Sequence, residues 1–141
     1  MLSKSGSSRP PLALPPAATS ALKTSVLADW RALAPRRLPD LHASVRERTA
    51  SSGELAHLLE PDIKESYGGL RDLTVLRAVA ASWVTDAPHA ELAPAKALLL
   101  DVRDALHRVA SRPTDRLAKQ EQGPVAEVLG TFDADTLLRD V

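Results

Sequence analysis

Residues 58–73 read Leu-Leu-Glu-Pro-Asp-Ile-Lys-Glu-Ser-Tyr-Gly-Gly-Leu-Arg-Asp-Leu and separate a leucine-rich segment from the start of an apolar-periodic one. Pro61 ends any helix that precedes it, while Gly68 and Gly69 permit backbone angles and close approaches that side chains forbid. From Leu70 onward, Leu, Val and Ala recur at three- and four-residue spacings, which predicts a core helix over residues 70–84. The stretch therefore predicts a sharp turn that leads into a buried helix.

The same turn concentrates charge. Lys64 and Arg71 flank the glycine pair, and Glu65 and Asp72 lie beside them. Free amide groups at a helix start, the positive end of the helix dipole and two cations together favour phosphate or carboxylate. The plain structural interpretation is a loop that joins two packed elements, because glycine most often marks a turn or loop that binds no ligand. Neither Gly-x-Gly-x-x-Gly nor Gly-Lys-Ser/Thr is present, which excludes the usual nucleotide loops as written.

The rest of the chain has a helical period, with little alternation of apolar and polar residues. It predicts further helices over residues 21–34, before Pro35, and over 39–49, 55–59, 91–112 and 115–129, with Gly130 as a C-terminal stop. Because the chain has one Phe and one Tyr, its core must be Leu, Val and Ala, with Trp30 and Trp83 as the large members. We predict an all-α helical bundle over residues 21–141, after a disordered Pro- and Ser-rich tail over residues 1–20.

Composition limits the function classes. The 141 residues include 18 Lys plus Arg and 18 Asp plus Glu, so no overall field selects a nucleic acid or an anionic membrane as partner. No apolar run approaches the roughly 20 residues of a membrane helix. Cysteine is absent, which excludes a disulfide framework and thiolate zinc sites and fits a reducing cytoplasm. We expect a cytoplasmic protein of one domain.

Candidate catalytic groups are sparse. No two of the four histidines, His42, His57, His89 and His107, have the spacing of a helical metal clamp, and no metal site is expected. Asp133 and Asp135 form an Asp-x-Asp, the arrangement with which two-metal phosphoryl-transfer sites hold cations. Since Leu137 and Leu138 follow, the pair is better interpreted as the cap of a final helix.

A second charged cluster, Arg112-Pro-Thr-Asp-Arg-Leu followed by Gln122, lies at the end of the long helix predicted over residues 91–112. Arg103, Arg112 and Arg116 could supply bidentate contacts to phosphate or carboxylate and form a wall facing Lys64 and Arg71. The alternative is a solvated connection whose ion pairs contribute little. The sequence leaves both interpretations open.

These stretches carry a resemblance. Residues 59–73, Val102-Arg-Asp-Ala-Leu-His, Arg112-x-x-Asp-Arg-Leu with Gln122, and Val125-Ala-Glu-Val-Leu-Gly resemble, in order and spacing, the bifunctional uridylyltransferase/uridylyl-removing enzymes of bacterial nitrogen control. The resemblance covers about residues 30–141 and corresponds to the helical region after the nucleotidyltransferase domain of that family. Matching positions are Lys64, Glu65, Gly68, Gly69, Leu70, Arg71 and Asp72 in the first signature, and Arg103, His107, Arg112, Asp115, Arg116 and Gln122 in the second.

The resemblance implies a role. In that family the enzyme transfers UMP from UTP to a tyrosine of the PII signal protein, with Mg²⁺, when glutamine is low, and removes it when glutamine is high. The helical region would pack on the catalytic domain, and Lys64, Glu65, Gly68, Gly69, Arg71 and Asp72 would border the nucleotide cleft. The implied partners are PII and a nucleotidyltransferase domain; glutamine synthetase adenylyltransferases share the domain style, so the nucleotide stays open.

The chain also departs from that pattern. Tyr67 stands where such enzymes often have Pro or Arg, and the metal-binding Asp-x-Asp strand, the His-Asp pair of the hydrolase and the regulatory domains are missing. We therefore expect a partial member that assists uridylyl transfer, has no catalytic residue or bound cofactor of its own and does not turn over UTP alone. The alternatives are a protein-interaction module or non-catalytic remnant without nucleotide binding, and, as a weaker option, an enzyme that uses Asp133 and Asp135.

Overall fold

The computed structural model describes residues 13–131 and 133–141. Within that part of the chain every regular element is a helix, which confirms the all-α prediction. The elements are α1 (Pro16–Ser52), the 3₁₀ helix η1 (Leu55–His57), α2 (Leu70–Ala81), α3 (Ala93–Ala110), α4 (Lys119–Leu129) and α5 (Ala134–Asp140).

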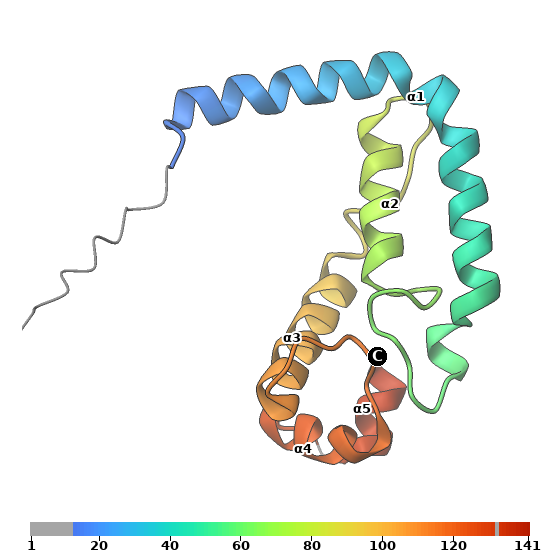
Figure 1. Cartoon of the computed structure of the whole chain (residues 1–141), viewed down its shortest axis with the longest axis vertical. Coiled ribbons are helices and arrows are strands. Elements are labelled where there is room, and N and C mark those ends of the chain that lie inside the picture. Colours follow the sequence, from blue (N-terminus) through green and yellow to red (C-terminus); the bar gives the residue numbers. More distant parts are fainter. Residues whose placement is uncertain (1–12, 132) are drawn as a thin grey trace, which may run out of the picture.

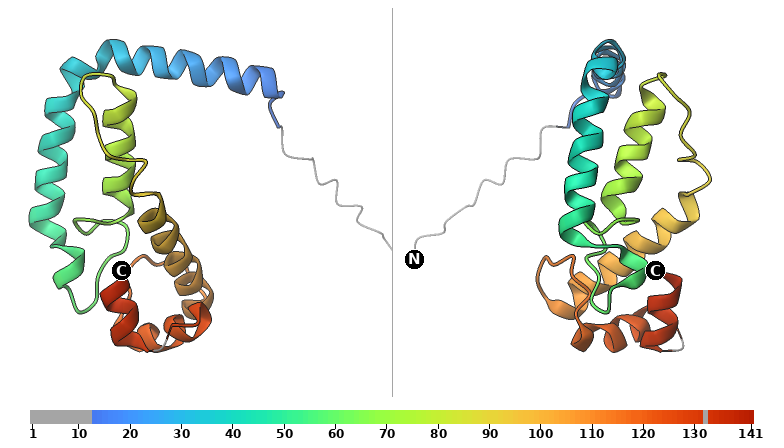
Figure 2. Two further views of the ribbon diagram at one scale, coloured as in Figure 1. Left: turned by 180° about the vertical axis from the view of Figure 1, so that it is seen from behind. Right: turned by 90° about the vertical axis from the view of Figure 1, so that its right-hand side faces the viewer.

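The helices form an elongated molecule (Figure 1). The second half of α1 runs beside α2, α3 leads away from α2 toward the opposite end, and α4 and α5 close that end around the C-terminus. The left view of Figure 2 shows from behind that the first half of α1 projects away from the rest. The turn over residues 58–69 and the segment between α3 and α4 meet inside the end built by α3, α4 and α5.

The core lies at that closed end. It is built from small and medium aliphatic side chains of η1, the turn, α2 to α5 and the segment between α3 and α4: Leu55, Ile63, Leu73, Leu99, Val102, Ala105, Leu106, Leu117, Val125, Ala126 and Leu137. Burying such side chains contributes about 1.5–3 kcal/mol for each large one. The turn and the segment between α3 and α4 are therefore part of the core, since Ile63 of the turn and Leu117 of that segment are fully buried.

Helix α1 differs from the prediction. Residues 21–34 and 39–49 were predicted as separate helices, yet Pro35 and Pro39 lie inside one helix of 37 residues. Each proline removes one backbone hydrogen bond, and Figure 1 shows a sharp bend in α1 in this part of the chain. A proline of favourable φ thus bends the helix without ending it.

The predicted tail boundary is also wrong. Residues 1–12 lie outside the described residues, but residues 16–20 belong to the first turns of α1. Pro16 occupies the first helical position, where its missing N–H costs nothing, and Ala17 and Ala18 have high helix propensity. Local propensity outweighed the composition on which the tail was predicted.

Both tryptophans lie outside the core, contrary to prediction. Helix α2 ends at Ala81, and Trp83 follows with φ of 62° and a side chain that is 75% exposed. The guanidinium of Arg31 lies 3.5 Å from the centroid of its ring. Trp30 is half-buried and donates from Nε1 to the carbonyl of Ala78 at 2.7 Å. These contacts join α1 to the C-terminal end of α2.

No helix among the described residues combines the length and the apolar character that crossing a membrane requires.

Candidate functional site: the charged turn and its basic groove

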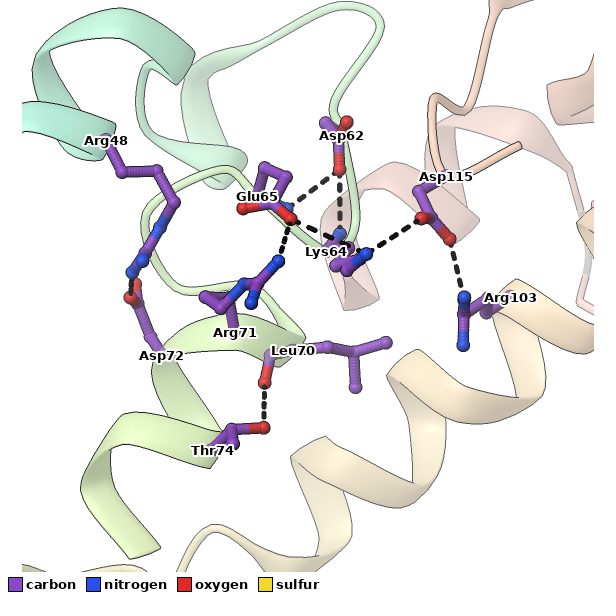
Figure 3. Close-up of polar contacts among 10 residues, drawn as sticks. All are labelled: Arg48, Asp62, Lys64, Glu65, Leu70, Arg71, Asp72, Thr74, Arg103 and Asp115. Atoms are coloured by element: carbon purple, nitrogen blue, oxygen red, sulfur yellow. Dashed lines mark hydrogen bonds and ion pairs between the residues drawn. The ribbon is translucent and has the colours of Figure 1, made fainter. Parts of the chain in front are cut away.

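The turn before α2 is closed by one aspartate. Asp62 Oδ1 accepts hydrogen bonds from the backbone amides of Lys64, at 3.0 Å, and Glu65, at 2.8 Å, and its carbonyl accepts from Ser66 N at 3.0 Å. A short carboxylate that accepts amides two and three positions on is a common way to hold a tight turn. The turn therefore places Lys64 and Glu65 side by side at the start of the site (Figure 3).

The glycine pair is needed for two different reasons. Gly68 has φ of +90°, a conformation that costs other residues free energy. At Gly69 a Cβ atom would lie 2.9 Å from the carbonyl oxygens of both Ile63 and Ser66, and 3.0 Å from that of Lys64. The backbone of the turn thus packs directly onto the helix start, where no side chain fits.

Because of this packing, the helix start has no free amides to offer an anion. The amides of Leu70 and Arg71 donate to the carbonyls of Ile63 and Lys64, each at 3.0 Å, and Asp72 N donates to Gly69 O at 3.1 Å. The expectation of free amides at this helix start is therefore wrong. Any anion at this site has to be held by side chains.

Asp72 serves the structure of the turn. Its Oδ2 accepts from Gly68 N at 2.8 Å, and its Oδ1 forms an ion pair with Arg48 of α1. The side chains of Arg48 and Asp72 are 14% and 15% exposed, so the pair is largely removed from water. The contact joins α1 to the start of α2, on the side away from Lys64 (Figure 3).

The two charged stretches of the sequence form one junction. Ile63 N donates to Asp115 O and Leu117 N donates to Pro61 O, both at 2.9 Å. Glu60 accepts from the backbone amide of Lys119 at 3.0 Å, and this bond, together with the neighbouring Arg116, lowers the pKa of its carboxyl. Segments about 55 positions apart are therefore held in register by backbone hydrogen bonds.

Two carboxylates, those of Glu65 and Asp115, orient three cationic side chains of the site. Glu65 accepts from Arg71 at 2.6 Å and lies 3.6 Å from Lys64 Nζ. The bond to Arg71 lowers the pKa of the Glu65 carboxyl and raises that of the guanidinium. Asp115 accepts from Arg103 Nε at 2.6 Å and lies 3.9 Å from Lys64 Nζ. Lys64 stands between the two carboxylates (Figure 3).

A groove of about 240 Å³ opens beside these pairs. Its walls come from the turn, α2 and α3, and its lining residues are Lys64, Leu70, Arg71, Thr74, Lys96, Leu100 and Arg103. The lining contains four cations and no carboxylate. We call it the basic groove.

Comparison with known proteins places the chain in a family. A family model described as GlnD PII-uridylyltransferase matches residues 39–139. The chain belongs to this family. Bifunctional uridylyltransferase/uridylyl-removing enzymes are similar to it: that of Streptomyces coelicolor is 62% identical over 123 residues, 87% of this chain and 15% of the relative. That of Mycobacterium tuberculosis is 35% identical over 127 residues, 84% of this chain and 16% of the relative.

The resemblance seen in the sequence is thereby confirmed, and its extent is clear. The chain spans about 15% of the length of the GlnD-family relative from Streptomyces coelicolor. The search of solved structures found no match.

In this GlnD-family chain, the three arginines of the second cationic cluster do not lie together. Arg103 joins Lys64 and Arg71 in the basic groove. Arg112 lies 3.5 Å from Glu121, and Arg116 bonds Glu60 at 2.6 Å, both outside the groove lining. The predicted wall of three arginines facing Lys64 and Arg71 therefore reduces to Arg103.

Sequence reasoning missed Lys96. It lies on α3, about two turns before Arg103 and so on the same face of the helix. That spacing was the available signal, but Lys96 lies outside both family signatures. Its place in the groove depends on how α3 packs against α2.

Asp133 is a cap, as predicted. Its Oδ1 accepts from Thr136 N at 2.7 Å at the start of α5, and this bond lowers the pKa of its carboxyl. Over residues 13–131 and 133–141 no group of three or more His, Asp or Glu side chains is placed to hold a metal ion. His107 Nε2 is buried 3.7 Å from Asp115 Oδ1 and has no hydrogen-bond partner among the described residues.

Proposed function

We propose that this chain is the helical, nucleotidyltransferase-associated part of a PII uridylyltransferase and that it assists the transfer of UMP from UTP to the PII nitrogen-regulatory protein. Membership of the GlnD family supports the reaction class. The observation that carries the proposal is the basic groove, because the two signature stretches meet and direct Lys64, Arg71 and Arg103 to one opening. A cytoplasmic location goes with the proposal, as the cysteine-free sequence suggests.

The chemistry of the groove fits the phosphates of UTP and not a magnesium ion. Its lining offers ammonium and guanidinium groups, whereas Mg²⁺ is held by carboxylates, waters and phosphate oxygens. We therefore propose that Mg²⁺ and the catalytic carboxylates belong to a separate nucleotidyltransferase domain. When bound there, Mg²⁺ would neutralise phosphate charge.

The residues of this chain would act on charge and position. Lys64, Arg71 and Arg103 would offset negative charge on the phosphates as it shifts toward the leaving group, which lowers the barrier only if the groups are held in place beforehand. Glu65 and Asp115 hold them so. The contribution is electrostatic, and no residue of the chain is assigned a covalent or proton-transfer step.

The test is transfer of labelled UMP from UTP to purified PII, with Mg²⁺. A separately expressed nucleotidyltransferase domain is measured with and without this chain, and the chain is measured alone. We expect no transfer by the chain alone and faster transfer by the mixture than by the domain. The Lys64→Ala/Arg71→Ala double variant should lose the enhancement, while Lys23→Ala, on the exposed start of α1, should keep it.

Two results would contradict the proposal. Transfer by the chain alone would make it an enzyme, with Asp133 and Asp135 as the first residues to test. A mixture no faster than the domain by itself would remove the assisting role and leave an interaction module.

One observation favours that second candidate function, a protein-interaction module. Leu22, Val26 and Leu33 on the projecting part of α1 are 55%, 56% and 48% exposed. They recur at helical spacing, so they form an apolar face that no described residue covers. A Leu22→Asp/Val26→Asp variant that folds normally but no longer binds PII or the catalytic domain would support this candidate.

A further inference from the structure

We propose that the basic groove binds a polyphosphate anion by itself, without Mg²⁺, and that Lys96 supplies a positive charge that no carboxylate of the described residues offsets. The inference rests on the proposed function in so far as the anion would be the phosphate chain of the transferred nucleotide. It adds a binding residue outside both signature stretches.

The first argument is that cationic side chains from three segments converge on one groove. Lys64 comes from the turn, Arg71 from α2, and Lys96 and Arg103 from α3, yet all four line one groove. Gathering like charges costs free energy unless counter-charges or a ligand offset them. Two counter-charges are present, Glu65 and Asp115, and both lie outside the groove lining.

The second argument is the charge balance. Glu65 pairs with Arg71 and Lys64, and Asp115 pairs with Arg103 and Lys64. Four cations against two carboxylates leave an excess of two positive charges at the groove. Lys96 forms no ion pair with any residue in the described part of the chain, although it is half-buried. One of the two excess charges is therefore that of Lys96, on the α3 side of the groove.

The third argument is the kind of donor that remains. Arg71 uses one terminal nitrogen on Glu65, and Arg103 uses Nε on Asp115, so each guanidinium keeps further N–H groups for a ligand. The hydroxyl of Thr74 already donates to Leu70 O at 3.1 Å. Recognition would thus come from charged donors, which match the several oxygens of a polyphosphate better than the two of a carboxylate.

The fourth argument is size. A groove of about 240 Å³ is smaller than the roughly 300–1,000 Å³ of pockets that enclose a whole drug-sized ligand. It suits the phosphate chain and not the complete nucleotide. Leu70 and Leu100 give it an apolar edge, which could contact the sugar or base as these leave the groove.

The experiment is calorimetric titration of the full chain with inorganic tripolyphosphate, without divalent metal, at low ionic strength. Lys96→Met removes the charge and keeps the apolar stem, and Lys23→Met removes one exposed lysine elsewhere. We expect saturable one-to-one binding that is weakened about tenfold by Lys96→Met and unchanged by Lys23→Met, since a charged hydrogen-bond donor is lost only in the first. Lys96→Arg should restore binding, and the urea midpoint should be the same for all variants.

Two results would overturn the inference: absence of saturable tripolyphosphate binding, or equal weakening by Lys96→Met and Lys23→Met, which would mean diffuse attraction to the surface. Both are distinguishable from failure of the assisting role. Enhanced UMP transfer without tripolyphosphate binding would exclude the groove as an anion-binding site and support the assisting role. Site-specific binding without enhanced UMP transfer would support the groove as an anion-binding site and exclude the assisting role.

Discussion

The side-chain amide of Gln122 donates a hydrogen bond of 2.7 Å to the backbone carbonyl of Leu59, although the two residues are 63 positions apart. The same nitrogen donates to Leu117 O at 3.1 Å. One nearly buried side chain thus satisfies a carbonyl from each of the two segments that meet at the junction. Its role here is to hold the turn, and with it Lys64, against the segment that carries Asp115.

Replacing this amide should weaken the junction. We expect Gln122→Ala to lower the free energy of unfolding by about 1–3 kcal/mol, because two carbonyls lose the donor that a nearly buried side chain supplies. Urea denaturation followed by circular dichroism measures the change. Gln120→Ala, on the exposed side of α4, is the matched control and should change stability by less than about 0.5 kcal/mol. Equal effects of the two variants would contradict the role of Gln122.

The packing of Gly69 predicts a steric effect. Gly69→Ala should destabilise the chain by about 1–3 kcal/mol, because its Cβ would meet backbone carbonyls that cannot rotate away. At Gly68 no atom lies within 4 Å of the added Cβ and only the positive φ matters, so Gly68→Asn should cost less, under about 1 kcal/mol. Thermal and urea unfolding of both variants test the order. A Gly69→Ala variant as stable as the original chain would refute the close packing.

Removing one partner of the ion pair between Arg48 and Asp72 should lower the stability of the chain. Arg48→Met should destabilise by about 3 kcal/mol, because the carboxylate of Asp72 stays largely buried without its cation. Adding Asp72→Asn should recover part of this loss, since the amide keeps an oxygen for Gly68 N. A double-mutant cycle from urea unfolding gives the coupling. Additive losses in the two single variants would mean that the pair has no energetic role.

Stability should fall in acid. The pKa values of Glu60 and Glu65 are lowered from 4.5, and that of Asp133 from 3.8. A carboxyl whose pKa is lower in the folded state contributes fully above its unfolded value and loses the contribution as pH falls through the folded value. The urea midpoint should therefore be lower at about pH 3 than at about pH 7.

Glu60→Gln separates the contribution of one group. It should reduce the difference between the two pH values, because the carboxylate that accepts from Lys119 N no longer titrates. Glu47→Gln, an exposed position on α1, should leave the difference unchanged. If Glu60→Gln leaves the acid loss intact, the hydrogen bond from Lys119 does not stabilise the charged form.

Much of the fold followed from local patterns. The helix that begins at Leu70, the cap by Asp133 and the left-handed stop at Gly130 were predicted and are present. They depend on hydrogen bonds within a few residues, which sequence determines directly. The error at Trp83 concerns packing. Trp83 fits the apolar stripe of residues 70–84, but the helix ends at Ala81 and the ring stacks on Arg31 of α1.

The candidate site was likewise predicted only in part from the sequence. The sequence singled out Lys64 and Arg71 because they flank a glycine turn before a helix. It did not reveal that the amides of that helix start are already bonded to Ile63 O and Lys64 O. Nor did it distinguish Arg103, which lines the groove, from Arg116, which bonds Glu60.

By itself, the sequence determined the helical class, the turn at residues 58–69 and membership of the GlnD family, since periodicity, glycine positions and motif spacing are properties of short stretches. Only the tertiary structure decided which charges share a surface. Lys96 joins Lys64 because α3 packs across α2 and because backbone bonds between residues 61–63 and 115–117 fix the register. Contacts between residues so far apart depend on how all the buried side chains fit together, and no local pattern encodes them.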